Sequence, residues 1–113
     1  MNEDILDAEE LLEECEDDKV MLARWVEIFA RDYDERLPRL REAVSGGDSA
    51  TVMNEAHAIK GSVGTFFAVA SFQTAQQLET MGREGDTAAA EQVLQQLESE
   101  IVALRQAMSE IIG

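Results

Sequence analysis

Hydrophobic residues recur along this 113-residue chain at steps of three and four, the spacing that places side chains on one face of an α-helix. The longest such stripe follows Lys19 and comprises Leu22, Val26, Phe29, Tyr33, Leu37, Leu40 and Val44. Pro38 lies inside this stripe, and because the periodicity continues beyond it, we expect the helix to bend there without ending. No alternating strand pattern competes with the helical one.

Three shorter stripes predict three further helices. The second helix carries Val52, Ala56, Ile59 and Val63. The third is expected from about Ala70 to Arg83, with an inward face made of Phe72, Ala75, Leu78 and Met81. The stripe of the last helix comprises Val93, Leu97, Ile101, Leu104, Met108 and Ile111.

Glycine and aspartate mark the connections between these helices. In residues 45–48 (SGGD), glycine suits the left-handed conformation after a helix and Asp48 can cap the next one. Gly82, Gly85 and Asp86 mark the turn between the third helix and the last. Short connections favour antiparallel neighbours, so the sequence predicts an all-α, up-down-up-down four-helix bundle over residues 19–112.

Residues 4–14 predict an additional short, acidic helix at the N-terminus. Its apolar side chains would cover one end of the bundle, and they are Ile5, Leu6, Leu11 and Leu12. A chain of this length holds one hydrophobic core, so we expect a single domain over residues 1–113. A monomer is the expected oligomeric state.

Composition narrows the classes of partner. Twenty-four acidic and nine basic side chains give a formal net charge of −15, which repels nucleic acid and anionic membrane surfaces. The N-terminus lacks the pattern of a secretory signal, and no apolar run approaches membrane-spanning length. Cys15 is the only cysteine, so no internal disulfide can form. These features predict a cytoplasmic protein.

His57 is the only histidine and the main candidate for chemistry near neutral pH. At about 100° per residue it lies roughly 130° from the centre of the buried stripe, so it should face solvent. Lys60 and Gly61 follow three and four positions later and share its surface. Lys60 is the only Lys or Arg between Arg41 and Arg83, and it would be the only cation on the second and third helices able to meet a phosphoryl oxygen. An ordinary solvated histidine remains the alternative.

Other chemistries have weaker support in the sequence. A metal site would need carboxylates such as Glu55 and Glu79 to converge on the histidine. Nucleophilic catalysis would need a base partner that no motif identifies, and no phosphate-binding glycine loop is present. We therefore expect a carrier, with no bound cofactor, and not an autonomous enzyme.

Residues 56–65 (AHAIKGSVGT) resemble the HxxKG signature of histidine-containing phosphotransfer (Hpt) domains, including the phosphoacceptor domains of chemotaxis kinases. Gly-Asp turns at residues 47–48 and 85–86 extend the likeness from about residue 18 to the end. Phe67 departs from it, because many members have glycine at this place. That departure predicts a differently packed turn.

The resemblance implies that His57 accepts a phosphoryl group from an aspartyl phosphate on one receiver domain and passes it to another. Lys60 would steady the phosphoryl oxygens, Gly61 would allow close approach, and Glu79 would hydrogen-bond the ring nitrogen that is not phosphorylated. The partners would be receiver domains and a hybrid or chemotaxis-type sensor histidine kinase, with Mg²⁺ bound in the receiver.

Two other functions are compatible with the sequence. The chain could be a detached phosphoacceptor domain of a chemotaxis-type kinase, which would take its phosphate from an ATP-bound kinase domain. It could also be an adaptor that binds a receiver without being phosphorylated. The intact HxxKG sequence argues against the adaptor, because binding alone does not require the histidine.

Overall fold

The computed structural model describes residues 3–113 and contains five helices within them. They are α1 (Ala8–Glu14), α2 (Lys19–Gly46), α3 (Ser49–Gly64), α4 (Val69–Glu84) and α5 (Ala90–Ile112). No strand occurs among the described residues. Met1 and Asn2, which the predicted single domain includes, lie outside them.

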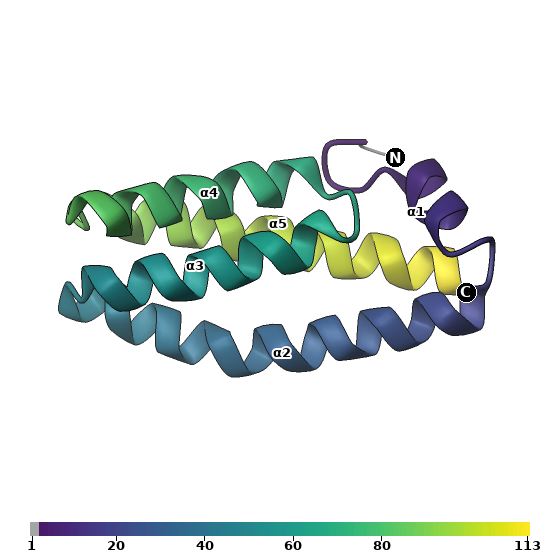
Figure 1. Ribbon diagram of the computed structural model, residues 1–113, viewed down its shortest axis with the longest axis horizontal. Coiled ribbons are helices and arrows are strands. Elements are labelled where there is room, and N and C mark those ends of the chain that lie inside the picture. Colours follow the sequence, from purple (N-terminus) through teal and green to yellow (C-terminus); the bar gives the residue numbers. More distant parts are fainter. Residues whose placement is uncertain (1–2) are drawn as a thin grey trace.

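Helices α2 to α5 form the predicted antiparallel bundle. Along the chain each helix runs back beside the one before it, and α5 closes the bundle by packing against α2 as well as α4 (Figure 1). Because the connections are short, each helix reverses direction and packs antiparallel to the one before it. The predicted all-α architecture is therefore confirmed.

Helix α2 is the longest element and passes through Pro38 without a break. Asp18 caps its first turn by accepting hydrogen bonds from the backbone N–H groups of Val20 and Met21, both at 3.0 Å. The ribbon of α2 is bowed along its length but remains continuous (Figure 1). The expectation that the helix continues past the proline is thus confirmed.

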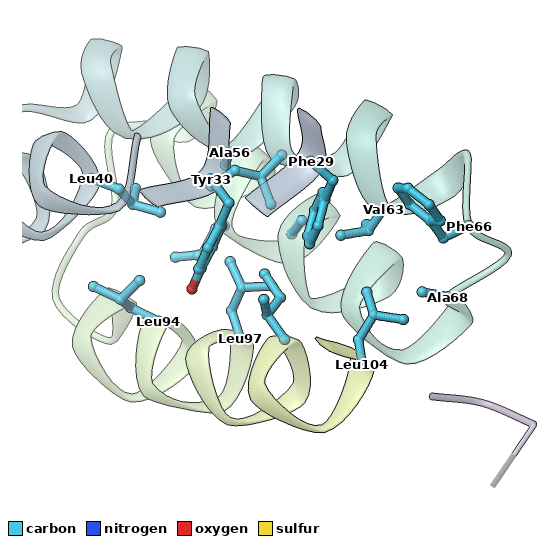
Figure 2. Close-up of a cluster of buried hydrophobic side chains, with 14 of the residues drawn as sticks. Phe29, Tyr33, Leu40, Ala56, Val63, Phe66, Ala68, Leu94, Leu97 and Leu104 are labelled. Carbon is cyan, nitrogen blue, oxygen red and sulfur yellow. The ribbon is translucent and has the colours of Figure 1, made fainter. Parts of the chain in front are cut away.

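The hydrophobic stripes meet in one core. Figure 2 shows side chains from α2, α3 and α5 converging on the space between the helices, among them Tyr33, Leu97 and Leu104. The Phe29 ring packs against Tyr33 and edge-on against Phe66, with centroid distances of 6.0 and 5.4 Å. The stripe predicted for the last helix is buried up to Met108, and Ile111 is half-buried.

The N-terminal segment covers the end of the bundle where α3 turns into α4 (Figure 1). Leu6 and Leu11 are fully buried, but helix α1 begins only at Ala8 and is shorter than the predicted 4–14. The preceding residues are not helical because their backbone groups pair with the α3–α4 turn. The N–H of Asp7 donates to the carbonyl of Phe67 at 3.2 Å.

Phe67 occupies the left-handed region with φ of +56°. This conformation favours glycine, in agreement with the residue that the resemblance places there. The half-buried Phe67 ring packs on the core, and the hydrogen bond from Asp7 holds its carbonyl. Packing by the N-terminal segment therefore maintains a turn that glycine would adopt without strain.

Candidate functional site

The sequence before α3 fixes where this helix starts and thereby which residues face outward. Gly47 has φ of +70°, and Asp48 caps the helix by accepting from the N–H of Thr51 at 3.2 Å and from its hydroxyl at 2.7 Å. The predicted stripe of α3 is buried in full. His57 consequently faces solvent, with 68% of its side chain exposed, as the periodicity predicts.

Gly82 brings α4 unusually close to α3. A Cβ atom at this position would lie 2.5 Å from the backbone nitrogen of Met53 and 2.7 Å from the carbonyl oxygen of Ser49. Gly82 is buried inside α4, so its assignment to the following turn is wrong; that turn contains Gly85, with φ of +73°. The absent side chain lets the two backbones touch, one turn away from Glu79.

Glu79 is the centre of the site. It is 5% exposed, and its Oε2 lies 3.0 Å from Nδ1 of His57, which confirms the predicted contact between these two helices. Its Oε1 lies 2.7 Å from Nζ of Lys60. The Lys60 ammonium, and after it the hydrogen bond to His57, holds the pKa of the Glu79 carboxyl below its usual range although burial opposes this. The carboxylate is therefore ionised at neutral pH.

Arg83 also binds this carboxylate. Its guanidinium lies 3.0 Å from Oε2 of Glu79, one turn along α4. Lys60 is therefore not the only cation at the site, because Arg83, the last residue of the predicted third helix, also contacts Glu79. An arginine in the last turn of a helix is usually explained by its favourable interaction with the helix dipole, so its position alone does not indicate this contact. Its i,i+4 spacing from Glu79 does indicate a possible ion pair.

Gly61 leaves open space beside His57. A Cβ atom built there would meet nothing within 4 Å, so the fold itself does not require glycine at this position. Gly64 is different, because its Cβ would lie 3.4 Å from the ring of Phe72. Phe72 was expected to face inward, but its ring is 36% exposed and lies 5.9 Å from the Lys60 ammonium, where it helps to shape the site.

Glu55 does not converge on the histidine. It pairs with two arginines of α2, at 3.2 Å from Arg36 and 3.8 Å from Arg39. Within residues 3–113 no three His, Cys, Asp or Glu side chains gather as metal ligands would. The arrangement around His57 is instead a carboxylate surrounded by an imidazole and two cations.

An apolar groove runs between α2 and the C-terminal half of α3. It has a volume of about 450 Å³, and its lining includes Trp25, Ile28, Thr65 and Phe66. Ile28 is 62% exposed there. Thr65, which lines the groove, lies one turn beyond Gly61. The helical stripes alone did not reveal it, since Trp25 lies beside the stripe of α2.

Comparison with known proteins connects this arrangement to a family. The Hpt domain family matches residues 24–107, which contain His57, Lys60, Gly61, Glu79 and Arg83. The chain belongs to the Hpt domain family. It is similar to the crystal structure of histidine-containing phosphotransfer protein B (HptB) from Pseudomonas aeruginosa PAO1. The TM-score is 0.86 at 26% identity, covering 95% of this chain and 93% of that one. No curated protein sequence matches the chain.

The function of this Hpt domain is histidine phosphotransfer in a phosphorelay, in which it acts as a phosphocarrier. Hpt domains interact with receiver domains and kinases in such relays. No helix among the described residues is long and apolar enough to cross a membrane.

Proposed function

We propose that Nε2 of His57 accepts a phosphoryl group from an aspartyl phosphate on one receiver domain and passes it to an aspartate of a second. The observation that carries this proposal is the 3.0 Å contact between Nδ1 of His57 and the buried carboxylate of Glu79. An ionised carboxylate can only accept a hydrogen bond, so Nδ1 carries the proton. The lone pair of the neutral ring is then on Nε2, on the exposed side.

The proposed step balances without a proton leaving the ring. A bond forms between Nε2 and phosphorus as the bond between phosphorus and the aspartyl oxygen breaks, and the aspartate leaves as a carboxylate. The proton on Nδ1 stays, so the phosphorylated ring has the charge of an imidazolium. Glu79 is already ionised beside that proton and stabilises the charge as it develops.

Lys60 and Gly61 have complementary roles in this proposal. Lys60 is half-buried, with its ammonium at the site, and a lysine stem is long enough to turn that ammonium towards phosphoryl oxygens on Nε2. Gly61 presents no side chain on the same face, so a receiver's active site can approach the ring. The receiver would supply Mg²⁺ and most of the stabilisation of the transferring group.

The apolar groove supports docking of a receiver on this face. Its lining residues lie on α2, at the C-terminal end of α3 and in the turn that follows α3. Trp25 is the only tryptophan of the chain, so its fluorescence can report binding to a tryptophan-free receiver. Affinity can thus be measured separately from phosphoryl transfer.

The test is incubation with a panel of phosphorylated receiver domains, followed by mass spectrometry for an acid-labile, base-stable phosphate on His57. We expect label on His57 and its passage to a second receiver. His57→Gln should abolish labelling while changing the free energy of unfolding by less than about 0.5 kcal/mol, because the side chain is exposed. A labelled His57→Gln variant would refute the assignment of the phosphoacceptor.

One observation favours a second candidate. The contact between His57 and Glu79, together with residues 64–66 (GTF), is a feature by which the chain resembles the phosphoacceptor domains of chemotaxis kinases. In that case an ATP-bound kinase domain would be the donor. The panel should therefore include such a kinase domain with ATP. Labelling by the kinase and by no receiver would select this candidate, and labelling by neither would leave the unphosphorylated adaptor.

A further inference from the structure

Arg83 and His57 both contact the same carboxylate oxygen, Oε2 of Glu79. Its guanidinium and Nδ1 of His57 each lie 3.0 Å from Oε2 of Glu79, while Lys60 occupies Oε1 at 2.7 Å. The Glu79 side chain is only 7% exposed, so these three groups take the place of water around it. The single negative charge of Glu79 is therefore paired with the positive charges of Lys60 and Arg83 before any phosphate is present.

This arrangement creates a conflict for Lys60. The proposed function requires its ammonium to turn to the phosphoryl oxygens, which removes it from Oε1 of Glu79. At the same stage the phosphorylated ring carries the charge of an imidazolium and most needs an ionised carboxylate beside Nδ1. A nearly buried carboxylate that loses its cation tends to take up a proton. The charged ring favours the ionised carboxylate, and Arg83 is then the other cation that remains against Oε2 of Glu79.

We propose that Arg83 is a positioning residue of the phosphorylated state, which keeps Glu79 ionised and its Oε2 against Nδ1 of His57 while Lys60 turns to the phosphoryl group. This inference rests on the proposed function. No covalent bond changes in this exchange: the Lys60 ammonium leaves its ion pair with Oε1 of Glu79 for a phosphoryl oxygen, and the proton on Nδ1 stays in place. A guanidinium suits the task because its charge is permanent and its planar donors fit a carboxylate.

The contact is poorly suited to a purely structural role. The Arg83 side chain is 58% exposed, and an exposed i,i+4 ion pair on a helix contributes little to stability. Arg39 provides a matched control, since its side chain is 60% exposed and it lies 3.8 Å from Glu55, away from the histidine. Removing either arginine should therefore leave the fold intact, which circular dichroism can check.

The first test needs no phosphate. Lys60→Met imitates the departure of Lys60, and ¹⁵N NMR of the His57 ring, recorded at a pH above which its ¹⁵N shifts no longer change, reports the fraction with the proton on Nδ1. We expect each of Lys60→Met and Arg83→Met to retain this tautomer, because the other cation remains. The double variant should lose it, with a coupling of about threefold to tenfold in the tautomer ratio. Arg83→Lys in the Lys60→Met background should restore it, and Arg39→Met should not change it.

The second test uses the loaded protein. Phosphoryl transfer from His57 to a receiver should slow about threefold to tenfold in Arg83→Met, within the range typical of coupled neighbours. Arg83→Lys should recover most of the rate, and Arg39→Met should transfer as the wild type does. Affinity for the receiver, followed by Trp25 fluorescence, should stay constant, which separates positioning from docking.

The two proposals fail in different ways. If the wild type accepts no phosphoryl group from any donor, the proposed function is wrong, even where the tautomer measurements show coupling. If the wild type transfers normally but the Lys60 and Arg83 effects on the tautomer are additive and Arg83→Met transfers at the wild-type rate, only the inference about Arg83 is overturned.

Discussion

Glu55 and Glu79 are both nearly buried carboxylates, and each is bound by two cationic side chains. The Glu55 side chain is 12% exposed and joins α3 to α2 through Arg36 and Arg39. The Glu79 side chain is 7% exposed and joins α4 to α3 through Lys60, with Arg83 on its own helix. Judged by burial and ion pairing alone, the two are equivalent.

The difference is a third contact. Only Glu79 also meets an exposed histidine, whose other ring nitrogen is directed away from the carboxylate. Glu55 therefore serves as a structural counterpart inside the same bundle. The comparison teaches that a buried ion pair does not identify a functional site until it orients a group that a partner can reach.

The comparison is tested most strongly by neutralising each carboxylate in turn. Glu79→Gln should slow phosphoryl transfer through His57 by about ten- to a hundredfold, the usual effect of removing a partner that orients a reactive histidine. Glu55→Gln should leave the rate within about twofold, since that carboxylate does not touch the ring. Single-turnover transfer to a receiver measures both variants. Equal losses in the two variants would show that Glu79 acts through stability and not through His57.

Acid should weaken the Glu79 cluster in a defined direction. Because the pKa of Glu79 is lower in the folded protein than in the unfolded chain, its ionised form stabilises the fold above the unfolded-state pKa of about 4.3. That contribution is lost as the pH falls through the lower folded-state pKa. Urea unfolding should show that the wild type exceeds Glu79→Gln in stability by about 1 kcal/mol near pH 7.

The same difference should shrink as the pH falls below the unfolded-state pKa, because protonation of Glu79 leaves both chains with a neutral group at position 79. Comparing the two variants at each pH removes the effect of the many other acidic residues, which they share. A difference that stays constant or grows on acidification would contradict the ionised state of Glu79.

The smallest expected effect concerns a pair of glycines. Gly61 lies beside His57 and Gly46 at the end of α2, and a Cβ at either position would meet nothing within 4 Å. Alanine at each should stabilise the protein, by up to about 1 kcal/mol, because glycine in a helix is entropically costly. Only Gly61→Ala should also slow transfer, by about twofold, and larger side chains at position 61 should slow it further. Thermal unfolding and transfer assays distinguish the two contributions.

The sequence predicted much of the fold and the outline of the site. Helical periodicity gave the direction in which His57 faces, and capping residues such as Asp48 gave the start of its helix. These features depend on residues within one or two turns of each other. The contact with Glu79 came from the family resemblance, since periodicity does not specify which residues of two different helices meet.

The features that were missed depend on tertiary contacts. Gly82 was read as part of a turn because glycines near residue 85 usually mark one, whereas its role is to let two backbones touch. Phe72 was placed in the core by its spacing, yet it packs beside Gly64 at the edge of the site. The contact of Arg83 with Glu79 is local, but only the contacts of Glu79 with His57 and Lys60 on α3 make Arg83 part of the site.

Gly82 and Gly61 lie on neighbouring helices, and the two positions differ in how many residue types the fold can accept there. In a library of variants selected only for a folded bundle, position 61 would accept many residues, because open solvent surrounds it. Position 82 would remain glycine, because even one methyl group would collide with the backbone of Met53. The set of residues accepted at position 61 would shrink only when the selection also required function with a partner. The residues accepted at each position therefore distinguish a constraint imposed by the fold from one imposed by a partner.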